Sequence, residues 1–195
     1  MVLALGVDAV GFNFHPGSPR HLSDHAAADL VRRVPAGVAT IGVFVHQTQA
    51  EVAAKMDASG VGWAQFHGDQ TRAELAQFPR PWYPALRPGT GEDRLQDTWP
   101  TPFVLVDARS PDAYGGTGKQ ADWRAAAALA QQCRVILAGG LGPDNLAEAV
   151  STVRPWGVDL NSGVETAPGC KDRRRLEQAL AALSPWRDGA EEGNR

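Results

Sequence analysis

Short apolar stretches alternate with amphipathic stretches along most of this 195-residue chain. Apolar residues are nearly continuous within each short stretch, which is typical of strands buried on both faces of a parallel sheet. A strand, a helix and a further strand in repeated succession predict right-handed βαβ units. The expected strands span residues 9–14, 40–45, 62–67, 82–86, 103–107, 135–139 and 158–161.

Helix starts and stops are recognisable between these strands. Ser23 and Thr48 are expected to cap two helices, which end near Pro35 and at Gly60. Later helices are expected over 122–132, from Pro143 onward, and over 171–183. Because there is neither a linker nor a shift in composition, residues 1–184 are expected to form one domain. Residues 185–195, which are polar and lack an apolar period, are expected to form a flexible tail.

Seven strands of this kind fit either a (β/α)8 barrel or an open doubly wound sheet. A dinucleotide-binding sheet would carry G-x-G-x-x-G after its first strand, and no such motif stands there. Glycine-rich turns instead follow the last three strands, where a barrel that binds phosphate places them. The sequence therefore predicts an α/β chain of the (β/α)8 barrel class.

Composition excludes several other classes of protein. The net charge of −3 and the mixed charges argue against a nucleic-acid partner or a membrane-surface partner. No apolar stretch approaches the roughly 20 residues that span a bilayer. The two cysteines, Cys133 and Cys170, are far apart and lack metal-ligand spacing, so a cytoplasmic protein without disulfides is expected.

Four motifs stand in order along the chain. They are Gly6-Val-Asp-Ala-Val-Gly-Phe-Asn-Phe-His-Pro-Gly-Ser-Pro-Arg20, Gln65-Phe-His67-Gly-Asp, Val106-Asp107-Ala with Tyr114-Gly-Gly-Thr-Gly-Lys119, and Leu137-Ala-Gly-Gly with Gly157-Val-Asp159-Leu-Asn-Ser-Gly-Val-Glu165. In this order the chain resembles the phosphoribosylanthranilate isomerase family of tryptophan biosynthesis. The resemblance covers nearly the whole chain and implies an Amadori rearrangement of a small phosphorylated substrate, with no metal and no cofactor.

The resemblance implies a catalytic role for Asp107, at the end of an apolar strand. The matching aspartate of the family is the general acid that protonates the ribose ring oxygen. A carboxyl group can do this near neutral pH only if its surroundings raise its pKa. Arg20 matches the arginine that contacts the anthranilate part of the substrate, a contact that suits a guanidinium. A loop-bracing aspartate and a solvated surface arginine are the structural alternatives.

Further residues are implied to bind substrate. Asp159 matches the aspartate that binds a sugar hydroxyl, and Gln65 and His67 match polar positions of the family. The glycine-rich turns are implied to hold the phosphate through backbone N–H groups, with Gly116, Gly139, Gly140, Ser162 and Gly163 as contacts. A structural hydrogen bond for Asp159, and tight turns that merely need glycine, are the alternatives.

The general base implied by the resemblance is a cysteine in Lys-Ile-Cys-Gly on the first strand of the family. Met1 aligns with the end of the first helix, so the first strand and most of that helix are expected to be missing. Cys133 is expected to be a small core residue, and Cys170 stands outside the motif position of the base. The alternative function is therefore a catalytically impaired fragment or a barrel that binds a phosphorylated ligand.

A second enzymatic alternative is another sugar-phosphate isomerase, such as the homologue of histidine biosynthesis. That enzyme would be expected to carry catalytic aspartates on strands one and five, with similar phosphate loops in both halves. No such internal repeat is present in the sequence. The oligomeric state, monomer or homodimer, is left open.

Overall fold

A computed structural model of the chain describes residues 1–88, 98–108 and 123–192. Residue contacts divide the chain into two units, which are described separately below. The first unit consists mainly of Leu3–Leu86, together with the segment that ends at Val104. The second consists mainly of Leu105–Arg195 and also takes in Arg87.

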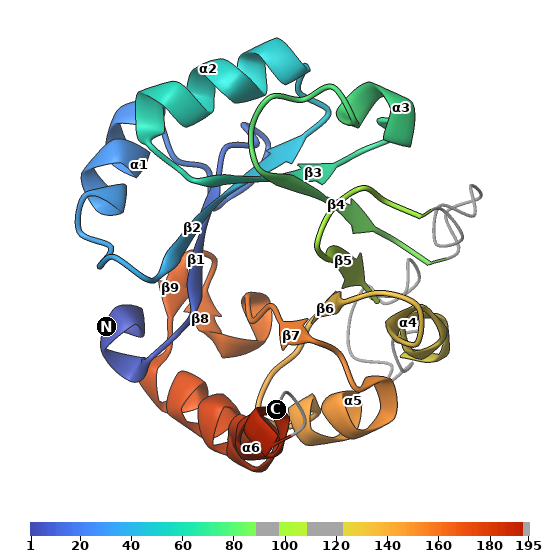
Figure 1. Ribbon diagram of the computed structural model, residues 1–195. Helices are drawn as coiled ribbons and strands as arrows, with labels where there is room; N and C mark the ends of the chain where they lie inside the picture. The colour runs from blue at the N-terminus through green and yellow to red at the C-terminus, as the bar shows by residue number, and fades with distance from the viewer. Residues whose placement is uncertain (89–97, 109–122, 193–195) are drawn as a thin grey trace. The chain divides into compact units, whose positions relative to one another are not determined.

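Strands and helices alternate in the order expected from the sequence (Figure 1). The elements are η1 Val2–Leu5, β1 Ala9–Asn13, α1 Asp24–Val31, β2 Ala39–Val45, α2 Gln49–Ser59, β3 Trp63–His67, α3 Arg72–Leu75, β4 Trp82–Leu86, β5 Val104–Asp107, α4 Trp123–Ala130, β6 Val135–Ala138, α5 Leu146–Val153, β7 Gly157–Val158, η3 Ser162–Val164, β8 Glu165–Ala167, β9 Cys170–Lys171 and α6 Arg173–Glu192.

The first unit is built on four parallel strands in the order β1-β2-β3-β4. Their register aligns Asn13, Val43, Gln65 and Tyr83 in one row across the sheet. Because side chains alternate between the faces of a strand, these four residues share one face. Helices α1 and α2 lie beside these strands in Figure 1.

The helix starts of the first unit follow the expected capping chemistry. The Ser23 hydroxyl accepts a hydrogen bond from the Ala26 N–H at 3.2 Å. Thr48 and Glu51 form a reciprocal capping box, and Gly60 ends α2 in the left-handed conformation at φ 78°. Helix α1 ends at Val31, before the stop expected at Pro35. Helix α3, which was not predicted, begins with a second capping box at Thr71.

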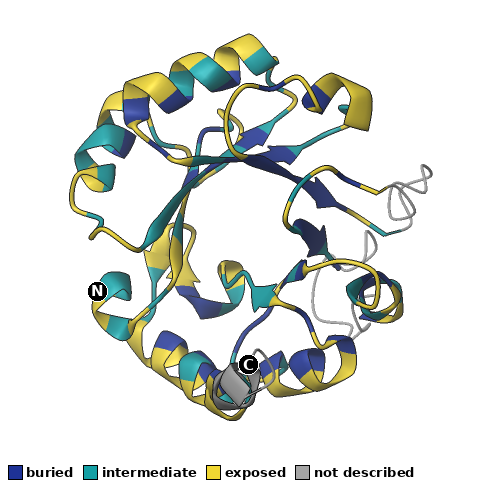
Figure 2. Ribbon diagram, viewed as in Figure 1, coloured by how far each residue is buried: buried dark blue, intermediate teal, exposed yellow. Residues whose placement is uncertain are grey.

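Aromatic side chains form the core of the first unit. Phe14 stacks on Phe44 with ring centroids 5.1 Å apart, and Phe44 contacts Phe66. Phe66 in turn meets the edges of Phe78 and Trp82. Edge-to-face packing of this kind stabilises a core beyond the apolar area that it buries. Figure 2 shows the buried residues concentrated on the strands and on the sides of the helices that face them.

The second unit places β5, β6 and β7 side by side. The Ala108 N–H donates to the Ala138 carbonyl at 3.1 Å, and Leu137 aligns with Val158 across the parallel pair β6 and β7. Helix α5 packs against both α4 and α6. Its buried residues, Leu146, Ala149, Val150 and Val153, follow the helical period and form much of the core of the unit.

The C-terminal elements differ from the expectation in three respects. Strand β7 ends at Val158, and the short antiparallel strands β8 and β9 follow it. Helix α5 begins at Leu146 rather than at Pro143. The expected end of the last helix at Leu183 is wrong, because α6 continues to Glu192 through Pro185. A proline keeps a helical φ and lacks one backbone donor, so a helix can continue past it at the cost of a hydrogen bond. The single domain over 1–184 stays a prediction. None of the described helices is long and apolar enough to cross a bilayer.

Candidate active site

Asp107 is the last residue of β5, where a parallel strand presents side chains to the carboxyl edge of its sheet. Its side chain is only 15% exposed. The guanidinium of Arg87 forms an ion pair with it, with Nε of Arg87 3.9 Å from Oδ2 of Asp107. Arg87 itself is largely exposed, so water screens much of this attraction.

Asp159 directly follows β7 and continues its pairing with β6. The Asp159 N–H donates to the Leu137 carbonyl at 2.8 Å, although the expectation placed this residue inside the strand. Burial raises the pKa of Asp159, the positive charge of Lys171 opposes this rise, and the negative charge of Asp107 adds to it. The negative charge of Asp107 therefore acts on the carboxyl group of Asp159.

The raised pKa of Asp159 predicts how the free energy of unfolding depends on pH. The folded chain holds a proton on Asp159 more strongly than the unfolded chain does. Stability should therefore fall as the pH rises above about 3.9, the value of a free carboxyl, and through the folded pKa. Asp159→Asn should remove this dependence, with a slope difference of at most about 1.4 kcal/mol per pH unit. Urea unfolding of both proteins across pH 4 to 8 measures it, and parallel curves would contradict it.

The turn after β6 contains Gly139 and Gly140, with φ of 111° and 69°. These values lie in the left-handed region, which favours glycine. Asn145 holds the turn on two sides. Its Oδ1 accepts from the Gly142 N–H at 2.9 Å, and its Nδ2 donates to the Gly140 carbonyl at 3.2 Å. The turn is thus fixed by an amide side chain before any ligand arrives.

The turn after β7 contacts the turn after β6. Ser162 and Gly163 lie in the short helix η3, whose Val164 is fully buried. A Cβ placed on Gly163 would lie 2.1 Å from the Leu141 carbonyl oxygen, and one on Gly142 would lie 2.8 Å from the Gly163 oxygen. The two turns expected to hold phosphate therefore meet backbone to backbone, and only glycine permits this approach.

Gly163→Ala is expected to lower the free energy of unfolding by about 2–3 kcal/mol, because the added methyl group would push the two backbones apart. Urea unfolding followed by circular dichroism measures the loss. Gly157→Ala is the matched control within the same unit, since its Cβ would meet only Ile136 Cγ1 at 3.7 Å. Equal effects of the two substitutions would rule out the close approach as the cause.

A lysine and a glutamate that were given no role in the sequence analysis, Lys171 and Glu165, support the second turn. Lys171 Nζ donates to Glu165 Oε1 at 2.9 Å, to Asn161 Oδ1 at 2.9 Å and to the Asn161 carbonyl at 3.1 Å. The Glu165 side chain is only 3% exposed and also accepts from the Gly169 N–H. The hairpin of β8 and β9 brings these groups together, and nothing in the spacing of Glu165 and Lys171 signals that contact.

The polar residues expected on strand three lie together in the first unit. Gln65 and His67 share one face of β3, and Gln65 Nε2 is 2.5 Å from His67 Nε2. The hydroxyl of Tyr83, on the neighbouring strand β4, donates to Gln65 Oε1 at 2.7 Å. Tyr83 was not predicted as a site residue, since a tyrosine in an apolar strand reads as core.

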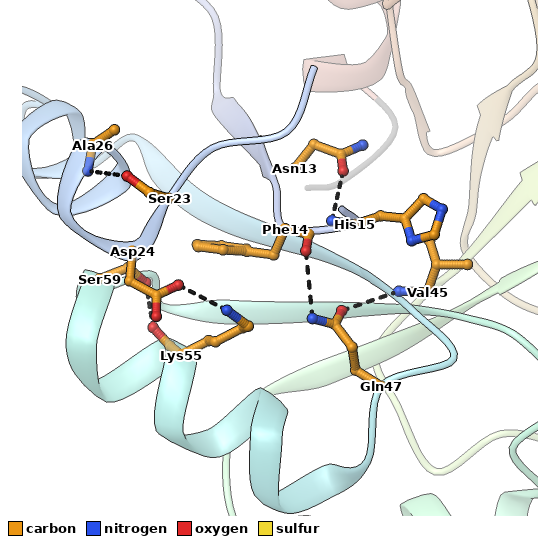
Figure 3. A network of polar contacts seen from close by, with 10 residues as sticks. All are labelled: Asn13, Phe14, His15, Ser23, Asp24, Ala26, Val45, Gln47, Lys55 and Ser59. Carbon is orange, nitrogen blue, oxygen red and sulfur yellow. Dashed lines mark hydrogen bonds and ion pairs between the residues drawn. The ribbon is translucent and has the colours of Figure 1, made fainter. Parts of the chain in front are cut away.

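Arg20 lies in the loop after β1, and its N–H donates to the Ser18 hydroxyl at 3.1 Å. Side chains hold the start of this loop (Figure 3). The His15 N–H donates to Asn13 Oδ1 at 2.9 Å. Gln47 bridges the ends of β1 and β2, since its Nε2 donates to the Phe14 carbonyl and its Oε1 accepts from the Val45 N–H.

The expected site residues thus fall into two groups. The second unit brings together Asp107, Asp159 and the turns at Gly139, Gly140, Ser162 and Gly163. The first unit carries Arg20, Gln65 and His67. Gly116 lies outside the described residues.

Neither cysteine occupies a buried position. Cys133 is exposed, so the expectation of a core residue is wrong: it follows the C-terminal end of α4, beyond the packed face of that helix. Cys170 is exposed in β9. Within the described part of the chain, no cluster of three or more histidine, cysteine, aspartate or glutamate side chains could hold a metal ion.

Comparison with known proteins identifies the family of this chain. The model of the family described as N-(5′-phosphoribosyl)anthranilate isomerase matches residues 2–182. The protein of that name from Thiobacillus denitrificans is 45% identical over 179 residues, which cover 90% of this chain and 87% of that protein.

Solved structures agree with the sequence match. The crystal structure of phosphoribosyl anthranilate isomerase from Thermotoga maritima matches with a TM-score of 0.81 and 29% identity, over 94% of this chain and 91% of that one. A second structure, of such an isomerase in complex with reduced 1-(o-carboxyphenylamino)-1-deoxyribulose 5-phosphate, matches with a TM-score of 0.79, 25% identity, and 94% and 90% coverage. The (β/α)8 fold class expected from the sequence is confirmed.

Proposed function

Because this chain belongs to the N-(5′-phosphoribosyl)anthranilate isomerase family, we propose that it catalyses the Amadori rearrangement of tryptophan biosynthesis. The substrate is N-(5′-phosphoribosyl)anthranilate and the product is 1-(2-carboxyphenylamino)-1-deoxyribulose 5-phosphate. The observation that carries the proposal is the pair of neighbouring carboxyl groups, Asp107 and Asp159, in the unit that also holds two touching glycine turns.

Asp107 would supply the proton that opens the sugar ring. Transfer of its carboxyl proton to the ribose ring oxygen lets the bond between C1 and that oxygen break, and the anthranilate nitrogen forms a Schiff base with C1. Removal of the proton from C2 then gives an enolamine, which becomes the aminoketone product. General-acid catalysis of this kind contributes about 10²–10⁴-fold to a rate.

The buried carboxyl group of Asp159 lies in the same unit as Asp107 and supports this proposal. Burial raises the pKa of Asp159, and the negative charge of Asp107 adds to the rise, so Asp159 retains a proton more strongly than a free carboxyl group does. Once a substrate is bound, Asp159 would accept a hydrogen bond from a sugar hydroxyl while Asp107 faces the ring oxygen.

The phosphate would lie against the turns after β6 and β7. Free backbone N–H groups in glycine turns and in short helices bind phosphate oxygens, and the absence of a side chain permits close contact. Gly139, Gly140, Ser162 and Gly163 supply such groups in this proposal. Arg20, Gln65 and His67 would contact the anthranilate end and the sugar, with Arg20 paired to the carboxylate.

The proton acceptor for C2 is not among the residues of this chain that match the motifs of the family. The resemblance gives this role to the cysteine of Lys-Ile-Cys-Gly, and residues 1–195 contain no such motif. Cys133 does not replace it, because it precedes β6 and so lies at the edge of the sheet opposite to Asp107.

The test supplies phosphoribosylanthranilate to the 195-residue chain and follows the loss of its anthranilate fluorescence. Turnover above the uncatalysed rate supports the proposed function. Binding of the reduced product without turnover would instead support the barrel that only binds a phosphorylated ligand. A chain that neither binds nor turns over these compounds would overturn both.

The proposal has consequences for partners and location. It names a small phosphorylated molecule as the ligand, without a metal or a cofactor, and a cytoplasmic location. Nucleic acid and membranes are not expected as partners, in line with the net charge of −3. The choice between monomer and homodimer stays open.

A further inference from the structure

Three polar side chains of the first unit form a continuous hydrogen-bonded series. Gln65 and Tyr83 are direct partners in the register of β3 and β4, so their side chains point to the same face of the sheet. His67 is two residues farther along β3 and therefore shares that face. The geometry of the sheet alone brings the three side chains into reach of one another.

The series is anchored at its buried end. Tyr83 is 1% exposed and Gln65 is 5% exposed, whereas His67 is only partly buried. The Tyr83 hydroxyl donates to Gln65 Oε1 at 2.7 Å, and Gln65 Nε2 lies 2.5 Å from His67 Nε2. Buried polar groups need partners, and a buried hydrogen bond that is lost costs more than the same bond in water.

Aromatic packing holds the ring of Tyr83 in place. The ring of Phe103 meets the Tyr83 ring edge-on, with the ring centroids 4.8 Å apart. The centroid of the Trp63 ring lies 6.4 Å from that of Tyr83. Phe103 and Trp63 also contact each other at 5.4 Å. A tyrosine within such a cluster cannot swing its hydroxyl group away from Gln65 without disturbing two other rings.

The direction of the hydrogen bonds then follows from the chemistry of the groups. An amide has one oxygen that only accepts and one nitrogen that only donates. With its oxygen facing the Tyr83 hydroxyl, Gln65 presents N–H to His67. The Nε2 atom of His67 must then accept, which requires a neutral imidazole that carries its proton on Nδ1. If the amide were turned over, its NH2 group would face the Tyr83 hydroxyl. The hydroxyl hydrogen would then lose Gln65 Oε1 as its acceptor.

We propose that Tyr83 is a positioning residue that, through Gln65, holds His67 in one neutral form with the proton on Nδ1. His67 is then neither a cation nor a general base at Nε2, since protonation there would break the bond from Gln65. The inference rests on the proposed function only in that His67 contacts the substrate. It adds that this contact is made by an uncharged imidazole of fixed orientation.

Nitrogen NMR of the histidine rings tests the inference without any turnover, so its failure is distinguishable from failure of the proposed function. The two ring nitrogens give different shifts in the two neutral forms, and His67→Asn assigns the signal among the five histidines. In the unaltered chain at pH 8, the signal of His67 should show a protonated Nδ1 and an unprotonated Nε2. A protonated Nε2 would overturn the inference.

Two variants separate the roles of Tyr83 and Gln65. Tyr83→Phe removes only the hydroxyl group and should lower the ratio of the Nδ1–H form to the Nε2–H form by about fivefold, the effect of one net hydrogen bond. Gln65→Glu places an acceptor beside the ring and should move the proton to Nε2. Near-ultraviolet circular dichroism checks that both variants remain folded.

The outcomes of the two variants are decisive together. If Tyr83→Phe leaves the form of His67 unchanged while Gln65→Glu alters it, Gln65 is oriented by something other than Tyr83 and the proposal fails. If Gln65→Glu also has no effect, the contact between Gln65 and His67 is not a hydrogen bond in solution, and the proposal fails at an earlier step.

Discussion

Asp107→Asn is expected to lower the rate of phosphoribosylanthranilate turnover by about 10²–10⁴-fold, because asparagine cannot deliver the proton that opens the ring. The amide has nearly the shape of the carboxyl group, so binding should change far less than turnover. Loss of anthranilate fluorescence gives the rate. Titration with the reduced product gives the affinity, which should stay within about fivefold, roughly the effect of one net hydrogen bond.

Asp57→Asn provides the control for a change of charge without a change in the site. The Asp57 side chain is 59% exposed and pairs with Arg80 on the surface of the first unit. Its substitution should leave both rate and affinity unaltered. If Asp107→Asn instead weakened binding as much as turnover, Asp107 would be a substrate-binding residue and another group would be the acid.

Lys171→Met should lower the free energy of unfolding by about 3–5 kcal/mol at pH 7, because it leaves the buried carboxylate of Glu165 without its cation. Methionine retains the apolar stem of lysine, so the loss reflects charge and hydrogen bonding more than packing. The three bonds from Nζ to Glu165 and Asn161 disappear together. Urea unfolding measures the change, and the double variant with Glu165→Gln should recover part of it, because glutamine carries no charge that needs a partner.

Lys55→Met is the matched control, because Lys55 pairs with Asp24 at a similar distance but in a more exposed setting. The Nζ to Oδ1 distance is 3.0 Å, and the Asp24 side chain is 41% exposed. A pair of this kind contributes about 0–1 kcal/mol. Equal losses for the two methionine variants would show that burial of Glu165 does not increase the contribution of its ion pair to stability.

The strands were predictable because each is short and largely apolar, and several are followed by a recognisable helix start. Ser23, Thr48 and Gly60 act as the sequence predicts, since capping depends on groups within a few residues. The ends of the chain elements were less predictable. Helix α6 passes Pro185, and β7 stops at Val158, because proline tolerance and strand length depend on what packs beside them.

The candidate site was predictable as far as single positions go. Asp107 stands at the end of a strand, and that placement follows from the order of elements. Asp159 was expected inside a strand and instead directly follows β7. The partners of site residues were not predictable. Tyr83 meets Gln65 through the register of two strands, and Lys171 meets Glu165 through a hairpin. Such contacts are set by the folded backbone, and the spacing of the residues in the sequence does not predict them.

Asn145 lies between two elements, the turn after β6 and helix α5. It stands immediately before α5, yet its side chain makes no capping bond to the helix and instead holds Gly140 and Gly142. An amide carries its acceptor and its donor on two separate atoms, whereas aspartate only accepts and serine or threonine has one hydroxyl for both roles, although all three can cap a helix start. The residue type at position 145 is therefore dictated by the loop, and a redesign guided by helix rules alone would remove the two bonds that hold the turn at Gly140 and Gly142.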